Sequence, residues 1–157
     1  MRLVIQRVSG AGVSWEQDGV GQQRAIGAGI VVLVGVGAED DEDTAERLAA
    51  KTRALRIFAD ADGRTNLSLP DVGGEALVIP QFTLYADLSR GRRPSYIGAG
   101  PAEHADHLYQ RFAHHLRAAG TRTETGCFGA HMEVEIRNDG PLTLVLSSDD
   151  WQARVPT

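Results

Sequence analysis

Ile30-Val31-Val32-Leu33-Val34 is the stretch that decides the fold, because it is an unbroken apolar run of strand length. A strand with one face in water alternates apolar and polar residues, whereas a strand covered on both faces is apolar throughout. This run therefore predicts a strand that is buried on both faces.

Further strands are predicted on either side of this run, from alternating side chains and from turn residues. Upstream they cover residues 1–8 and 12–16, and Asp18-Gly19 supplies a turn after them. Downstream they cover residues 75–79, 123–127, 132–137 and 142–146, with Asn138-Asp139-Gly140-Pro141 joining the last two. Strands dominate, and the sheet is expected to be largely antiparallel.

Two helices are predicted between the strands. The acidic residues 39–43 suit a helix N-terminus, where negative charge offsets the helix dipole, and helical spacing continues to near Phe58. Pro101 fits the first position of the second helix, and Gly120 fits its end. The apolar face of this second helix is predicted to contain Leu108, Phe112, His115, Leu116 and Ala119. Residues 88–100, rich in Gly, Arg, Ser and Pro, are expected to form a long loop.

The composition is that of one globular α/β domain, placed at residues 1–147, with a polar tail at 148–157. Hydrophobic residues make up 42% of the 157, and no apolar run approaches the ~18 residues of a membrane span. The N-terminus lacks the apolar segment of a secretory signal, so we expect a cytoplasmic protein. A net charge of -5 argues against a general nucleic-acid coat, although a local basic patch can still bind RNA.

Common catalytic and metal-binding signatures are missing from the chain. There is no G-x-S-x-G elbow, no H-E-x-x-H zinc motif and no P-loop, and the single cysteine excludes a Cys-pair zinc site. Residues 60–63 are interpreted as a turn and not as a calcium loop. His104 and His107 are interpreted as part of a solvated helix face, so neither a metal nor a cofactor is expected. Cys127 and His131 leave two readings open, a thiol nucleophile with its base or a small apolar residue at a strand end.

Three segments are candidates for function. In Gln81-Phe82-Thr83, a hydroxyl and successive backbone N–H groups can face a substrate carbonyl, as in an oxyanion hole, although an ordinary strand start also fits. In residues 138–143, the Gly140-Pro141 bond is either cis or an ordinary trans turn. Arg90, Arg92 and Arg93 form the densest basic cluster of an acidic protein, which fits either a phosphate contact or a solvated loop.

Taken together, ordered motifs along nearly the whole chain resemble one family, the D-aminoacyl-tRNA deacylases. The motifs that carry the resemblance are Gln6-Arg7-Val8, Asn66-Leu67-Ser68-Leu69, Gln81-Phe82-Thr83-Leu84-Tyr85-Ala86-Asp87, Gly91-Arg92-Arg93-Pro94-Ser95, Gly126-Cys127-Phe128-Gly129-Ala130-His131-Met132 and Asn138-Asp139-Gly140-Pro141-Leu142-Thr143. The resemblance implies a compact β/β/α layered domain that forms a symmetric homodimer and hydrolyses the ester of D-aminoacyl-tRNA.

The same resemblance implies roles for particular residues. Gly140-Pro141 would be a cis peptide that enters the partner's active site, grips the amino group of the substrate and excludes L side chains, while glycine passes. Arg7 and Met132 would hold this turn, and Asn138 belongs to its motif. The N–H groups of Phe82 and Thr83 would form the oxyanion hole, with Gln81 shaping the site near the terminal adenosine. A substrate-assisted reaction through the free ribose hydroxyl is preferred over attack by Thr83, because no base for Thr83 is visible.

One departure from the family pattern concerns Pro80, where the motif usually has serine. Proline removes a hydroxyl and a backbone N–H, so the substrate range or the activity is expected to depend on it. Two alternatives follow, a deacylase of altered range and a catalytically inactive dimeric protein that binds tRNA. A thiol hydrolase using Cys127 is the third reading.

Overall fold

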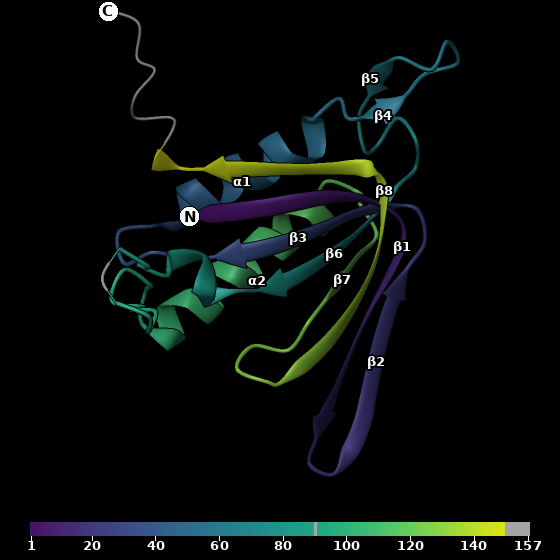
Figure 1. The fold of residues 1–157 in the computed structure, drawn as a ribbon. Helices are drawn as coiled ribbons and strands as arrows, with labels where there is room; N and C mark the ends of the chain where they lie inside the picture. Colours follow the sequence, from purple (N-terminus) through teal and green to yellow (C-terminus); the bar gives the residue numbers. More distant parts are fainter. Residues whose placement is uncertain (90, 150–157) are drawn as a thin grey trace, which may run out of the picture.

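The computed structural model describes residues 1–89 and 91–149 (Figure 1). The six strands of the main sheet are β1 (Arg2–Gln17), β2 (Val20–Ile26), β3 (Gly29–Gly35), β6 (Glu75–Pro80), β7 (Thr123–Thr125) and β8 (Met132–Ser147). A small hairpin contains β4 (Phe58–Ala59) and β5 (Thr65–Leu67), and the helices are α1 (Glu42–Ala54), α2 (Ala102–Ala118) and the 3₁₀ turn η1 (Phe82–Tyr85). The predicted tail falls mostly on residues 150–157, outside the described residues. None of the helices in the described ranges is long and apolar enough to cross a membrane.

The long strand β1 organises the sheet. Its first half pairs with β3, its second half pairs with β2, and β8 runs along its other edge, all antiparallel. The predicted break between strands 1–8 and 12–16 is therefore wrong, and so is the break between 132–137 and 142–146. In both places the chain bends and shifts register without ending the strand. The expectation of antiparallel pairing holds for β1, but β3, β6 and β7 are parallel neighbours.

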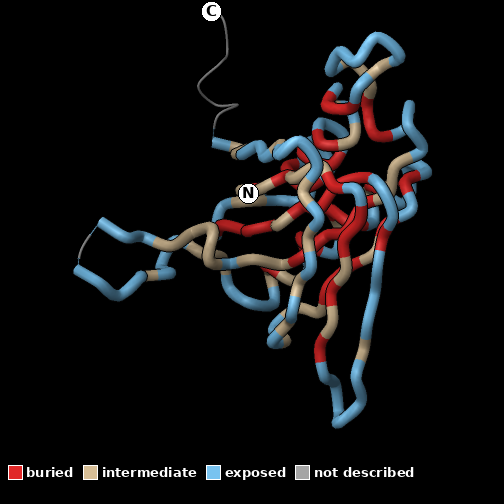
Figure 2. Tube along the Cα trace, turned by 45° about the vertical axis from the view of Figure 1, so that its right-hand side comes forward, coloured by how far each residue is buried: buried red, intermediate tan, exposed pale blue. Residues whose placement is uncertain are grey.

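The bend of β1 divides the molecule into three layers. Beyond residue 10, β1 turns away with β2 and the first half of β8 and packs across one face of β3 and β6. Val13 and Trp15 of this arm contact a core that contains Val31 and Leu77. The two helices cover the opposite face, so Ile30, Val32 and Val34 are buried beneath them. Figure 2 shows the buried segments running through the centre, with the β1–β2 turn and the β4–β5 hairpin exposed. The central run is thus covered on both faces, as predicted.

Local chemistry explains the helix limits. The Asp41 carboxylate caps α1 by accepting from the Thr44 N–H at 2.8 Å. The helix stops at Ala54 and not near Phe58, because Leu55 is extended and Phe58 pairs in β4. Pro101 is the N-cap of α2, one residue before the first helical position at which it was predicted. The buried face of α2 contains Tyr109, which the apolar pattern omitted, whereas the predicted His115 is only half-buried.

Candidate active site

A cleft of about 530 Å³ opens where β6 ends. It lies between η1, the start of α2 and the loop from β7 to β8. Among the predicted site residues, Gln81, Phe82 and Met132 line it, and Pro80 joins them. Residues that are distant in the sequence thus meet at one end of the two sheet layers.

The segment Gln81-Phe82-Thr83 begins a 3₁₀ turn, so the strand reading of this segment is wrong. The Gln81 N–H donates to Val34 at 2.7 Å, which ties the turn to the central strand. The side-chain amide of Gln81 donates to the Thr83 hydroxyl. The N–H groups of Phe82 and Thr83 have no backbone or side-chain acceptor among the described residues, as expected for the first amides of a helical turn. Two adjacent donors are therefore free beside the cleft.

Contacts with β1 hold the far side of η1. The Arg2 guanidinium lies 4.4 Å from the centre of the Tyr85 ring and donates to the Leu84 carbonyl at 3.2 Å. The Tyr85 hydroxyl donates to Asp40 at 3.3 Å. Burial, together with the Asp40 charge, raises the pKa of Tyr85 well above its usual range. The phenol therefore stays neutral and keeps its role as a donor.

The floor of the cleft depends on close packing at Gly126. A Cβ at this position would lie 2.7 Å from the Met132 sulfur and 3.4 Å from the Pro80 ring, so only glycine lets these residues approach. The buried Tyr109 hydroxyl donates to the carbonyls of Gly126 and Val78 at 3.2 and 3.1 Å. Burial raises the pKa of Tyr109, which remains protonated. The α2 helix thereby fixes the floor from behind.

The rim of the cleft carries an aromatic pair and the predicted basic loop. The Phe82 and Tyr96 rings meet edge to face with centroids 5.1 Å apart, and both side chains are partly exposed. Arg92 and Arg93 are exposed on the adjoining loop. The predicted Arg90 lies outside the described residues. Two of the three arginines thus stand in the loop that leads to Tyr96 at the cleft.

The Gly140-Pro141 peptide is cis, the conformation that the resemblance implies. Asn138 supports the turn by donating to the carbonyls of Arg7 and Leu142 at 2.8 and 3.0 Å. The Arg7 guanidinium donates to the Ile57 carbonyl at 2.6 Å and pairs with the Asp139 carboxylate at 2.9 Å. Gly140 has φ +125°, a conformation that L side chains rarely adopt, and a Cβ there would lie 3.0 Å from the Arg7 guanidinium.

The predicted site residues therefore form two separate groups within one chain. Gln81, Phe82 and Met132 line the cleft, whereas none of Arg7, Asn138, Gly140 or Pro141 does. Met132 and Pro141 stand on the two halves of β8, and the strand between them covers up to about 30 Å when extended. Among the described residues Met132 makes no hydrogen bond with the turn, and its sulfur instead accepts from the Cys127 N–H at 3.2 Å.

The alternative thiol site finds no support in the geometry. The Cys127 sulfur lies 3.9 Å from the Phe128 carbonyl, and the described residues show no hydrogen bond between Cys127 and His131. Cys127 packs beside the core cluster of the β1–β2 arm. His107 pairs with Glu42 at 2.8 Å, and residues 1–89 and 91–149 hold no cluster of potential metal ligands.

Sequence reasoning missed several residues of the cleft. Tyr96, Ala102 and Phe128 line it, but none was singled out as a site residue. Phe128 belongs to the motif 126–132, in which only Cys127 and His131 were considered as a nucleophile and its base. Tyr96 lies three residues after Arg93 in the same loop, so the loop itself was the available signal.

Comparisons with known proteins agree with this architecture. The family model described as D-Tyr-tRNA(Tyr) deacylase matches residues 4–147. A D-aminoacyl-tRNA deacylase of Thermotoga petrophila is 51% identical over 94% of this chain and 97% of the relative. One from Roseiflexus sp. (strain RS-1) is 54% identical over 94% of each chain.

Solved structures show the same fold. The c-Myc DNA Unwinding Element Binding Protein superposes with a TM-score of 0.85 and 38% identity, covering 94% of this chain and 99% of that one. A probable eukaryotic D-amino acid tRNA deacylase superposes with a TM-score of 0.80 at 17% identity, over 92% of this chain and 97% of that one, which supports the fold alone. The family match over most of the chain, together with relatives at about half identity, establishes that this protein belongs to the D-aminoacyl-tRNA deacylase family.

Proposed function

We propose that this protein hydrolyses the ester bond of D-aminoacyl-tRNA, releasing the D-amino acid and free tRNA. The observation that carries the proposal is that the N–H groups of Phe82, which lines the cleft, and of the next residue, Thr83, have no acceptor among residues 1–89 and 91–149. Ester hydrolysis passes through a tetrahedral species whose oxygen gains negative charge. Donors fixed in advance stabilise that charge, and the loss of one such donor typically costs about 3 kcal/mol.

The second step of the proposal concerns the nucleophile. The Thr83 hydroxyl accepts from Gln81, and no carboxylate, histidine or lysine among the described residues bonds to it. A hydroxyl without a base is a weak nucleophile. We therefore assign activation of the attacking water to the free ribose hydroxyl of the terminal adenosine, with Gln81 positioning that end of the substrate. Attack by that hydroxyl itself would only move the acyl group to the neighbouring ribose oxygen, where water must still cleave the ester.

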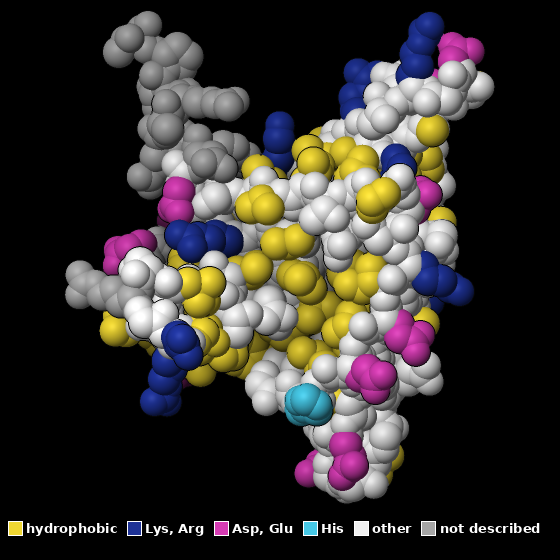
Figure 3. All heavy atoms as spheres, in the orientation of Figure 1, with side chains coloured by type: hydrophobic (Ala, Val, Ile, Leu, Met, Phe, Trp, Pro, Cys, Tyr) yellow, Lys and Arg dark blue, Asp and Glu magenta, His cyan; other side chains and the backbone are white. Residues whose placement is uncertain are grey.

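The third step is a symmetric homodimer. Val145, Val4 and Leu33 are direct neighbours across β8, β1 and β3, and Val145 is 74% exposed. Figure 3 shows hydrophobic side chains gathered over these strands, on the face away from the helices. A two-fold axis here would cover the same patch on both copies. In such a dimer the Gly140-Pro141 turn of each copy would also reach the cleft of the other copy.

The partner's turn would supply the stereochemical selection. Its Gly140 and Pro141 carbonyls would bind the amino group of the substrate and leave no space for an L side chain. Arg7 and Asn138 support this role because they hold the turn from below, and Met132 would meet it from the cleft. Glycine has no side chain to exclude, so mischarged glycyl-tRNA is proposed as a second substrate.

Pro80 lines the cleft at the position where the family motif usually has serine. This difference is the reason for two alternative functions. One is a deacylase of altered range, and the other is an inactive protein that still binds tRNA. In either case we expect a cytoplasmic protein, since its substrate is aminoacyl-tRNA.

The deciding experiment follows ester loss from D-Tyr-tRNA and L-Tyr-tRNA against a control without protein. We expect rapid loss of the D ester only. Stable D and L esters with tRNA still bound would replace the proposal with the binding-protein alternative. Loss of both esters would leave the hydrolase but remove its stereochemical selection.

A further inference from the structure

We propose that the 3′ end of the tRNA leaves the cleft over Arg92 and Arg93, and that these arginines contact phosphates of its single-stranded terminus and not of the duplex stem. This inference rests on the proposed function and adds the path and the bound part of the substrate. It depends on the placement of the loop and on the charge of the opposite rim.

The loop is anchored at the cleft. Asp87 and Ser95 exchange two backbone hydrogen bonds of 2.7 and 3.1 Å, and the Asp87 carboxylate accepts from the Ser89 N–H at 2.9 Å. The next residue, Tyr96, lines the cleft and contacts Phe82. The base of the loop is therefore fixed at the rim, beside the atoms proposed to act on the ester.

The two arginines are available to a ligand. Both are exposed, and neither takes part in any ion pair or hydrogen bond found among the described residues. Arginine binds phosphate through a planar fork of donors, so an unpaired arginine at this place suits a nucleic-acid backbone.

The reach of the loop selects the part of the tRNA. Arg92 is three residues from the anchored Ser95, so the two Cα atoms can be at most about 10 Å apart. Nucleotides of a stacked strand repeat every ~3.4 Å. If the terminal adenosine lies in the cleft, the arginines meet the nucleotides directly before it. In tRNA these nucleotides are single-stranded.

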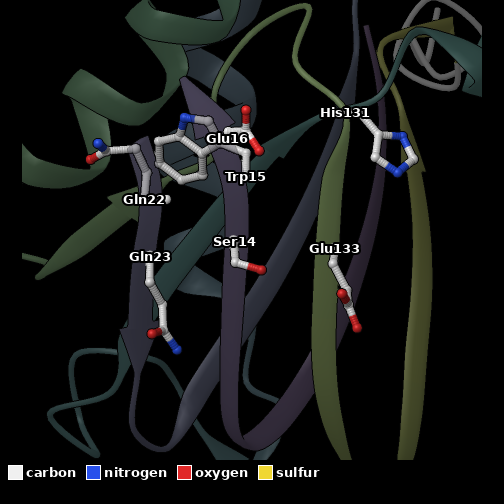
Figure 4. A pocket seen from close by; sticks show the side chains of 8 residues that line it. Ser14, Trp15, Glu16, Gln22, Gln23, His131 and Glu133 are labelled. Atoms are coloured by element: carbon white, nitrogen blue, oxygen red, sulfur yellow. The ribbon is translucent and has the colours of Figure 1, made fainter. Parts of the chain in front are cut away.

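The opposite rim repels phosphate. A shallow polar hollow of about 620 Å³ adjoins the cleft, and His131 borders both. Figure 4 shows Ser14 of β1 between Gln23 of β2 and Glu133 of β8 in this hollow. Glu16 also lines it, and acidic side chains follow this arm in Figure 3. A polyanion therefore finds attraction on the loop side of the cleft and repulsion on the arm side.

The test compares the double variant Arg92→Ala/Arg93→Ala with the unaltered protein on three esters. These are D-tyrosyl-adenosine, a D-tyrosyl trinucleotide of sequence CCA, and D-Tyr-tRNA. We expect kcat/KM to fall about tenfold on the trinucleotide and by the same factor on tRNA. The loss should vanish on the adenosine ester, which contains no phosphate. The slope of log kcat/KM against log salt should become shallower by about 1.4 for the trinucleotide.

Two further variants serve as controls, one for the loss of an exposed positive charge and one for the acidic side of the cleft. Arg64→Ala also removes an exposed arginine, but from the β4–β5 hairpin on the other side of the molecule, and should leave all three rates unchanged. Glu133→Gln should not lower any rate. A loss caused by Glu133→Gln on the trinucleotide would place the strand in the polar hollow and overturn the path over the loop.

Other outcomes also decide the matter. A loss seen only with tRNA would assign the arginines to the duplex stem, and an equal loss on the adenosine ester would assign them a structural role. No loss on any ester would remove them from the substrate path. If the unaltered protein hydrolyses none of the esters, the proposed function fails. The path is then tested by binding, where tRNA without its last three nucleotides should lose the effect of the double variant.

Discussion

The two halves of β8 differ in what they serve. The half that begins at Met132 alternates half-buried and exposed residues, packs against the floor of the cleft and contributes to its lining. The half beyond Asn138 is mostly exposed and carries the turn held by Arg7, together with the exposed Val145. One half thus completes a local cleft, whereas the other presents a fixed turn whose residues 138–141 do not line the cleft of their own chain. We infer that the turn is built for a second copy.

The largest expected effect is at the cleft that the first half of β8 helps to line. Phe82→Pro removes one of the two free N–H donors, at the first position of η1, where proline is tolerated. We expect kcat to fall about 100- to 1000-fold on D-Tyr-tRNA relative to Phe82→Ala, which lacks the ring but keeps the N–H. Thermal unfolding checks that both variants fold. Equal activity of the two variants would show that this donor plays no part in the reaction.

The next effect is at the turn. Gly140→Ala places a Cβ 2.9 Å from the Leu142 nitrogen at a backbone conformation that alanine avoids, so the turn must move. A displacement of about 1 Å in a group that positions substrate can reduce the rate about 100-fold. We expect this loss for the D ester and a narrower gap between D and L esters, measured in the same assay. An unchanged D to L ratio would separate the turn from stereochemical selection.

Mixing Phe82→Pro with Gly140→Ala tests whether the cleft and the turn of one site come from different chains. After joint unfolding and refolding, half of the dimers should contain one Phe82→Pro and one Gly140→Ala chain. Each mixed dimer would have one cleft in which both contributions are intact, so about a quarter of the original activity should return if chains mix at random. Either variant refolded alone is the control. Activity that never rises above that of the separate variants would place the whole site within one chain.

The sequence could predict what depends on local patterns. The apolar run Ile30–Val34 predicted a strand covered on both faces, and the acidic stretch before Thr44 predicted the start of α1. Both depend on periodicity and capping, which act over a few residues. The bends of β1 and β8 were misread as strand ends because glycine and polar residues punctuate them. β1 stays paired on both sides of its bend, with β3 as far as Val8 and with β2 from Ala11, whereas residues 139–142 of β8 have no partner in β1 and the pairing resumes at Thr143.

The candidate site was predictable only in parts. The motifs identified Gln81, Phe82 and the Gly140-Pro141 turn, but no local pattern says that only the first two line the cleft of their own chain. The contribution of Tyr96 and Phe128 depends on how β6, α2 and the β7–β8 loop pack, which is a tertiary property. Tyr109 was missed because its hydroxyl is satisfied by carbonyls of distant strands.

A smaller effect is expected behind the cleft. Tyr109→Phe removes the hydroxyl that bonds to the Gly126 carbonyl in a buried setting, at a cost of about 1 to 2 kcal/mol in the free energy of unfolding. For a chain of this size the melting temperature should fall by about 3 to 6 °C. Tyr85→Phe is the matched control, since its hydroxyl makes one longer bond of 3.3 Å, and it should cost less. A larger loss for Tyr85→Phe would contradict the assigned support of the floor.

The smallest effect is expected at Cys127, in the loop from β7 to β8 beside the cleft. Its N–H, not its thiol, makes the contact with the cleft, since it donates to the Met132 sulfur at 3.2 Å. Cys127→Ala keeps that N–H and removes the sulfur, so kcat on D-Tyr-tRNA should stay within about twofold of the original. A thiol nucleophile predicts nearly complete loss from the same change, and Cys127→Ser would not rescue it. Phe82→Pro leaves the thiol in place, and Cys127→Ala leaves the Phe82 N–H in place. Comparing the two variants therefore assigns ester hydrolysis either to the backbone donor or to the sulfur.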